Sequence, residues 1–167
     1  LKVLKKYKIK IISSGGTFKK IKNLGYECSE VSSYTNFNEM LGGRIKTLHP
    51  KIHAGILYDR SNKKHKLEMK KKEFPSIDLI VVNFYPFQNT LVNTKSSKNI
   101  IENIDIGGPT LVRAAAKNYN DVAVVTDPSQ YNNLINEIKI NKGCTNIDFR
   151  KRLSEEAFGL TAYYETL

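Results

Sequence analysis

Four short segments of this 167-residue chain combine residue types that could do chemistry. The first, Ser13-Ser14-Gly15-Gly16-Thr17, lies between a predicted strand and a predicted helix. Consecutive glycines allow backbone N–H groups to turn toward an anion, and a helix start adds partial positive charge. No Gly-Lys-Ser/Thr follows, so this is not a Walker loop. A phosphate cradle and an ordinary tight turn both fit the segment.

The second segment, Gly42–Pro50, places two cations, a hydroxyl and an imidazole after a flexible glycine pair. Arg44 can fork onto a phosphate or a carboxamide, and Lys46 points the same way if the segment is extended. A solvated basic loop is the alternative. His49 and His53 have a zinc-like spacing, but the proline after His49 weakens the helix face that such a site needs. We therefore expect no metal.

The last two segments lie at the middle of the chain and shortly after it. Asn83–Phe87 ends the most apolar predicted strand, and Tyr85 could present its hydroxyl to a ligand or plug the core. Asp105 precedes Gly107-Gly108, a second pair whose amides can face a ligand. Lys117, on the helix that follows, is a candidate proton carrier if its three neighbouring alanines bury it, and an ordinary solvated lysine otherwise.

The elements that must position these residues alternate along the chain. The pattern predicts strands over 9–13, 26–31, 77–83 and 121–126, and helices over 18–24, 96–103, 110–119, 128–140 and 148–167. This order predicts an α/β fold with a doubly wound, mostly parallel sheet, in which ligands bind at the carboxyl ends of strands. Residues 32–58 show little periodicity and predict a long functional loop.

Composition narrows the class of protein. Hydrophobic residues make up 40% and charged residues 26%, which is typical of one globular domain. The net charge is +11, and 22 of the 27 basic residues are lysines against 16 acidic residues, so we expect a solvated basic surface and no nucleic-acid partner. No apolar run approaches the roughly 20 residues that span a membrane. Cys28 and Cys144 fit reduced thiols in the cytoplasm.

Three longer runs together resemble a known family. They are MLGGRIKTLHPKIHAGIL (Met40–Leu57), VVNFYPF (Val81–Phe87) and ENIDIGGPTLVRAAAKN (Glu102–Asn118). They are similar to the inosine-monophosphate (IMP) cyclohydrolase domain of the bifunctional purine-biosynthesis enzymes, which also carry a formyltransferase acting on the carboxamide ribotide AICAR. The resemblance is colinear from residue 9 to residue 164. It implies a methylglyoxal-synthase-like, three-layer α/β fold.

The resemblance also implies how much of the enzyme is present. Both ends of the chain fall inside helical patterns, so we expect a piece of a longer polypeptide. Residues 1–167 would form the cyclohydrolase domain without its first strand, and the formyltransferase domain would be absent. This domain would need no cofactor, whereas the absent domain would use 10-formyltetrahydrofolate. The full-length enzyme would be a cytoplasmic homodimer.

The implied reaction closes formyl-AICAR to IMP with loss of water. Carried over by motif, Lys117 is the proton donor and acceptor, Lys46 and Tyr85 serve the formyl oxygen, and Asp105 orients the carboxamide. The expected nucleotide contacts are Ser14, Gly15, Gly16, Thr17, Arg44, Thr47, Asn83, Ile106 and Gly107. The alternatives are a nucleotide-sensing regulatory domain of the same fold, a methylglyoxal synthase and a basic nucleic-acid-binding domain.

Overall fold

The strands form two parallel ladders in the computed structural model, which describes all residues from 1 to 167. β1 (Ile12–Ser13) pairs with β2 (Ser29–Glu30), and β3 (Leu79–Val81) pairs with β4 (Ala123–Val125). The predicted α/β class with parallel strands is confirmed. The two ladders are separate, because no ladder joins β1 to β3. That the domain has a further first strand, which this chain lacks, stays a prediction.

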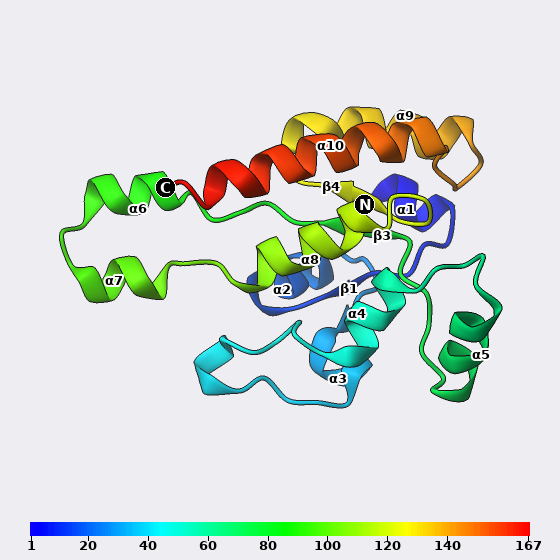
Figure 1. Ribbon diagram of the computed structural model, residues 1–167, viewed down its shortest axis with the longest axis horizontal. Helices are drawn as coiled ribbons and strands as arrows, with labels where there is room; N and C mark the ends of the chain where they lie inside the picture. The colour runs from blue at the N-terminus through cyan, green and yellow to red at the C-terminus, as the bar shows by residue number, and fades with distance from the viewer.

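Helices occupy most of the remaining chain and surround the strands (Figure 1). In chain order they are α1 (Lys2–Lys6), α2 (Gly15–Asn23), α3 (Val31–Thr35), the 3₁₀ turn η1 (Leu41–Gly43), α4 (Pro50–Leu57), α5 (Lys63–Lys71), α6 (Phe87–Asn93), α7 (Ser97–Glu102), α8 (Gly107–Lys117), the 3₁₀ turn η2 (Pro128–Gln130), α9 (Tyr131–Ile140) and α10 (Ile147–Tyr164).

The prediction of one long loop over residues 32–58 is wrong, because α3, η1 and α4 lie there. Pro50 begins α4 instead of weakening it, since the first helical position has no use for an N–H. The His49 side chain caps the same helix by accepting the Lys51 N–H at 3.1 Å. By contrast, the predicted helix start at Asp127-Pro128 is confirmed, and Asp127 forms a capping box there.

β4 lies in the middle of the hydrophobic core. Residues 122–125 are fully buried, as expected for a strand covered on both faces. α8 packs against β3 and β4, and it also contacts α4 and α10. The helix contributes Ala115 and Ala116, which are fully buried and have almost no side chain to hold the backbones apart. One face of α8 therefore packs closely against the strands and the neighbouring helices.

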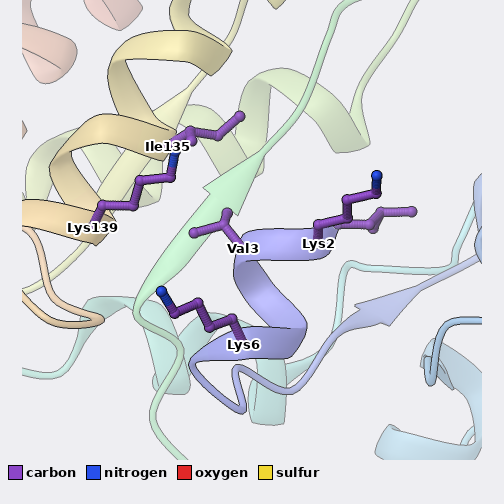
Figure 2. Close-up of a pocket in the computed structure, with 6 residues that line it drawn as sticks. Lys2, Val3, Lys6, Ile135 and Lys139 are labelled. Atoms are coloured by element: carbon purple, nitrogen blue, oxygen red, sulfur yellow. The ribbon is translucent and has the colours of Figure 1, made fainter.

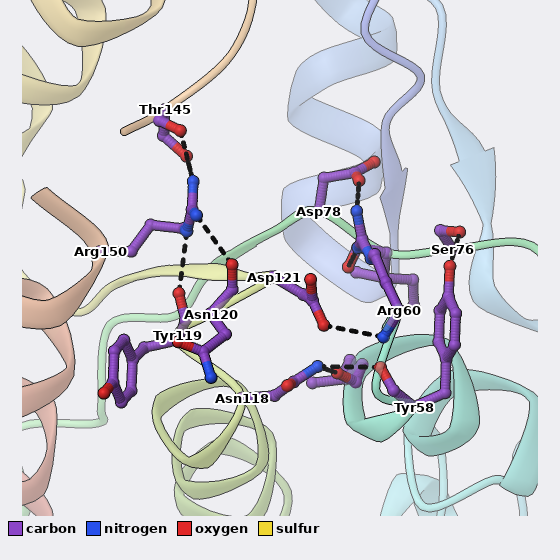
Figure 3. Close-up of polar contacts among 12 residues, drawn as sticks. Tyr58, Arg60, Ser76, Asp78, Asn118, Tyr119, Asn120, Asp121, Thr145 and Arg150 are labelled. Atoms are coloured by element: carbon purple, nitrogen blue, oxygen red, sulfur yellow. Dashed lines mark hydrogen bonds and ion pairs between the residues drawn. The ribbon is translucent and has the colours of Figure 1, made fainter. Parts of the chain in front are cut away.

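A polar network fixes the end of α8 that lies near the amino ends of β3 and β4 (Figure 3). The Asn118 side chain donates to the carbonyl oxygens of Ile56 and Tyr58 at 2.8 and 3.1 Å, which satisfies the end of α4. Arg150 of α10 donates to the carbonyl oxygens of Tyr119 and Asn120 at 2.8 and 2.7 Å. This corner joins three helices without any ligand.

Arg60 extends the same corner to the strands. Its guanidinium donates to Asp78 at 2.7 Å, and its backbone N–H donates to the Asp121 carboxylate at 3.0 Å (Figure 3). Asp78 directly precedes β3 and Asp121 lies two residues before β4, and the Ala123 N–H donates to the Asp78 carbonyl at 3.0 Å. The amino end of this ladder is thus occupied by structural contacts, which leaves the carboxyl end for a ligand.

Two glycines in helices test the packing. A Cβ on Gly55 of α4 would lie 2.8 Å from the Pro75 carbonyl oxygen, whereas a Cβ on Gly159 of α10 meets nothing within 4 Å. We expect Gly55→Ala to lower the free energy of unfolding by about 1–3 kcal/mol through overpacking. We expect Gly159→Ala to raise it by about 0.5–1 kcal/mol through helix propensity. Urea unfolding of both variants measures this, and equal changes would contradict the packing described.

Candidate functional site

The first turn of α2 is the open end of a helix. It follows β1 directly, and Gly15 has φ +55°, a left-handed conformation that favours glycine. Ser14 occupies the N-cap but its side chain makes no capping bond, and the first turn contains no acidic residue. The N–H groups of Gly15, Gly16 and Thr17 therefore stay open to an anion, which the helix dipole also favours.

Lys46 lies beside this turn. Its Nζ is 3.9 Å from the position of a Cβ on Gly15, and it forms an ion pair with Glu39 at 3.4 Å. Its side chain passes directly over Gly43, where a Cβ would lie 2.7 Å from Lys46 Cε and 2.9 Å from Nζ. Glycine at position 43, which has φ +91°, therefore allows the ammonium to reach the α2 turn.

The neighbouring threonine reaches the second glycine pair. Thr47 Oγ1 is 3.2 Å from the position of a Cβ on Gly107, at the start of α8. The Asp105 carboxylate accepts the Gly108 N–H at 2.8 Å, and the Asp105 N–H donates to the Tyr164 hydroxyl at 2.8 Å. The segment that carries Lys46 and Thr47 thus bridges the starts of α2 and α8.

Arg44 lies at the rim of this arrangement. Its guanidinium forms an exposed ion pair with Glu102 at the end of α7. The side-chain hydrogen bonds of the pair raise the pKa of Arg44 and lower the pKa of Glu102. Without a ligand, Arg44 is therefore held by Glu102, and a phosphate or carboxamide would have to compete for it.

The loop after β3 supplies a separate group of side chains. Tyr85 is 67% exposed, so it does not plug the core, and its hydroxyl is available to a ligand. Phe87 is buried instead and Phe84 is partly buried. The Asn83 side chain donates to the Tyr131 hydroxyl at 2.9 Å, which ties the loop to α9.

Lys117 is not brought to the same place. It is the last residue of α8, ten residues after Gly107, which corresponds to about 15 Å along a helix. Its side chain is exposed, so burial among the alanines is not observed, and the next residue is part of the polar corner. Its expected role in proton transfer stays a prediction. Ile106, by contrast, is the N-cap residue of α8 beside Gly107 and is exposed.

Three residues at the site were not expected from the sequence: Glu39, Glu102 and Tyr164. Glu39 lies just before the basic segment, so its proximity to Lys46 is local. Glu102 and Tyr164 reach the site from distant positions, through the ends of α7 and α10. No spacing in the sequence signals either contact.

A shallow pocket lies elsewhere, between α1 and α9 (Figure 2). It has a volume of about 400 Å³ and is lined by Leu1, Lys2, Val3, Lys6, Ile135 and Lys139. None of these residues belongs to the four segments with candidate chemistry, so we place the site at the α2 and α8 turns. No three His, Cys, Asp or Glu side chains gather as metal ligands would. None of the helices has the length and apolar character that crossing a membrane requires.

The placement of Lys46 can be tested at the glycine pair. Gly42 and Gly43 both have positive φ, but a Cβ on Gly42 meets nothing within 4 Å. Gly42→Ala controls for alanine at a positive φ, although φ is +63° at Gly42 and +91° at Gly43, and only Gly43→Ala displaces Lys46. We expect Gly43→Ala to weaken binding of IMP, the expected ligand, at least about tenfold more than Gly42→Ala does. The difference corresponds to the loss of one charge-assisted contact from the displaced Lys46. Titration calorimetry measures both affinities, and equal losses would contradict this placement.

His53 connects α4 to the basic segment and gives a pH prediction. Its Nε2 is buried without a hydrogen-bond partner. Burial lowers the pKa of His53 below its usual 6.5, partly opposed by a backbone hydrogen bond with Thr47. The unfolded chain therefore binds this proton first, so the free energy of unfolding should fall as the pH falls below 6.5 through the folded pKa.

Urea unfolding between pH 7 and pH 5 measures that dependence. We expect the slope of stability against pH to be shallower in His53→Leu than in the parent protein, since the variant cannot take up the proton. Identical slopes would show that His53 does not titrate differently in the folded and unfolded states.

Comparisons with known proteins identify the family and the fold. The MGS-like domain family matches residues 1–110, and the AICARFT/IMPCHase bienzyme family matches residues 115–167. A solved structure titled "Crystal structure of ForH" superposes with a TM-score of 0.88 at 26% identity, over 99% of this chain and 85% of that one. The predicted methylglyoxal-synthase-like fold is therefore confirmed.

Curated relatives carry the name bifunctional purine biosynthesis protein PurH. The protein of Bradyrhizobium diazoefficiens is 46% identical over 98% of this chain, and that of Prochlorococcus marinus strain NATL2A is 53% identical over 93%. The chain spans about a third of the length of these relatives, 31% and 30% respectively. On these matches, the chain belongs to the MGS-like domain family, and it is similar over nearly its whole length to part of the bifunctional purine biosynthesis proteins.

Proposed function

We propose that this chain is an IMP cyclohydrolase domain, which closes formyl-AICAR to IMP in purine biosynthesis. One observation carries the proposal. The segment with Lys46 and Thr47 lies against two glycine-bearing helix starts at once, with Lys46 Nζ 3.9 Å from the Gly15 Cβ position and Thr47 Oγ1 3.2 Å from the Gly107 Cβ position. The names of the curated relatives support the same pathway.

The proposed reaction needs positioning and proton transfer. The carboxamide nitrogen attacks the formyl carbon, and the resulting carbinolamine loses water. Both groups belong to one molecule, so holding the reactive rotamer is a large part of the catalysis. The obstacles are a weakly nucleophilic amide, charge on the attacked oxygen and a poor hydroxide leaving group. We propose that neither step uses a cofactor, because no electrons are exchanged and water is the only other product.

The two helix starts divide the substrate between them. The open N–H groups of Gly15, Gly16 and Thr17 suit the phosphate, which the α2 dipole attracts. Lys46 adds a positive charge beside that turn and can also donate a proton toward the formyl oxygen. Asp105 faces the ligand from the α8 side, where a carboxylate held by the Gly108 N–H can orient a carboxamide.

The outer groups complete the proposed site. Exposed Tyr85 can donate its hydroxyl to the departing oxygen. Arg44 is released from Glu102 when a ligand competes for its guanidinium. Thr47 and Ile106 line the start of α8, and Asn83 holds the loop before Tyr85. These contacts, like the homodimer and the cytoplasmic location expected from the sequence, are predictions.

One observation favours a second candidate, a domain that binds the nucleotide without converting it. Lys117, the expected proton donor and acceptor, lies a helix length away from Asp105. If proton transfer depends on Lys117, the site described here would bind a nucleotide and leave it unchanged. Turnover is therefore the decisive measurement, because affinity for IMP is common to both functions.

Substitutions at the site test the proposed function. We expect Lys46→Met and Asp105→Asn to lower kcat/KM for formyl-AICAR by about 10²–10⁴, the usual cost of losing a general acid, a general base or its orienting group. The matched control is Lys66→Met, which removes an exposed lysine of α5 and should leave kcat/KM unchanged. Absorbance of the purine product follows the reaction in the natural full-length protein.

The Lys117→Met variant tests whether proton transfer depends on Lys117 or on the residues at the α2 and α8 turns. An unchanged rate in Lys117→Met, together with large losses in the other two variants, would assign the proton transfer to Lys46 and Asp105. Parent-like rates in Lys46→Met and Asp105→Asn would refute the proposed site. Tight binding of IMP without any turnover in the parent protein would support the sensing domain instead.

A further inference from the structure

Tyr164 connects two loops of the site that are far apart in sequence. It is the last residue of α10 and is 9% exposed. Its hydroxyl accepts the N–H of Asp105 at 2.8 Å. Its ring packs edge-on against Phe84, with the centroids 5.2 Å apart, and against Phe87 at 5.9 Å. Figure 1 shows the end of α10 reaching the start of α6, where the loop after β3 ends.

Each contact of Tyr164 fixes a different functional group. Phe84 and Phe87 flank Tyr85, the exposed tyrosine of the loop after β3. Asp105 begins the short turn that leads into α8, and its carboxylate bonds only within that turn, to the Gly108 N–H. The hydrogen bond to the Tyr164 hydroxyl thus connects Asp105, at the beginning of this turn, to α10.

We propose that Tyr164 is a positioning residue for the nucleotide site, setting the separation between the Asp105 carboxylate and the Tyr85 hydroxyl. Its hydroxyl fixes the Asp105 backbone, and its ring fixes the loop that presents Tyr85. Tyr164 does not touch the substrate and takes no proton from it. This inference rests on the proposed function, because Tyr164 would orient Asp105 and Tyr85 for that reaction without contacting the substrate.

The contact between Tyr164 and Asp105 is a single hydrogen bond. A neutral hydrogen bond of this kind changes an equilibrium or a rate by about two- to tenfold. Because Asp105 acts on the reacting carboxamide and the phosphate is held at α2, misplacement of Asp105 should affect kcat more than KM. A purely structural tyrosine would instead lower the melting temperature and leave both constants of the folded enzyme unchanged.

The test compares two neighbouring tyrosines in the natural full-length protein. Tyr164→Phe removes the hydroxyl and keeps the ring. Tyr163→Phe is the matched control, because this tyrosine is 52% exposed and its hydroxyl contacts only the Gln88 side chain of α6. Tyr164→Leu removes both the hydroxyl and the ring contacts with Phe84 and Phe87. The readouts are kcat and KM for formyl-AICAR well below the melting temperature, and hydrogen exchange of the Asp105 amide.

We expect kcat to fall about two- to tenfold in Tyr164→Phe and further in Tyr164→Leu, with KM within about twofold of the parent value. Exchange of the Asp105 amide should accelerate by a similar factor in Tyr164→Phe, while the amides of residues 15–17 keep their parent rates. Tyr163→Phe should match the parent protein in every readout.

Two results would overturn the inference. One is an unchanged kcat in Tyr164→Phe, and the other is an unchanged exchange rate at Asp105. If the parent protein shows no turnover, the proposed function fails, and the exchange rates alone then decide whether Tyr164 fixes the Asp105 turn. The two failures are therefore distinguishable.

Discussion

The parallel pairing of β3 with β4 is the constraint on which the rest of the site depends. Two parallel strands can be joined only by a connection that returns to the starting end, and the returning element here is α8. α8 must therefore begin near the carboxyl ends of the strands and finish near their amino ends. Asp105, just before the helix, and Lys117, at its end, are separated for this reason.

The two ends of the ladder consequently have different tasks. At the amino end, Asn118, Arg60 and Arg150 donate to helix carbonyls and loop backbone, so this end is occupied by contacts within the protein. At the carboxyl end, the Lys46–Thr47 segment bridges the start of α8 to the first turn of α2, which follows β1 of the other ladder and lacks a side-chain cap and an acid. Helix N–H groups that the protein leaves unpaired are suited to an anionic ligand.

Close approach between side chains and backbone gives the carboxyl end its shape. Lys46 crosses Gly43 at a distance that any Cβ would obstruct, and Thr47 approaches Gly107 almost as closely. Gly43 and Gly107 are therefore required for the space above their backbones, whereas Gly15 is favoured by its left-handed φ of +55°. The positive charge of Lys46 is balanced by Glu39 at 3.4 Å, which keeps the lysine in place before a ligand arrives.

The sequence by itself determined the α/β class, the buried strand at residues 122–125, the helix start at Asp127 and the glycine turns, because each depends on local periodicity, caps or turn residues. The tertiary structure decided the rest. The division of the strands into two ladders, the distance of Lys117 from Asp105 and the hydrogen bond from Asp105 to Tyr164 depend on how α8 and α10 pack on β4. Such contacts join residues far apart along the chain, so no local pattern encodes them. They form only when helices and strands from distant parts of the sequence pack into one core.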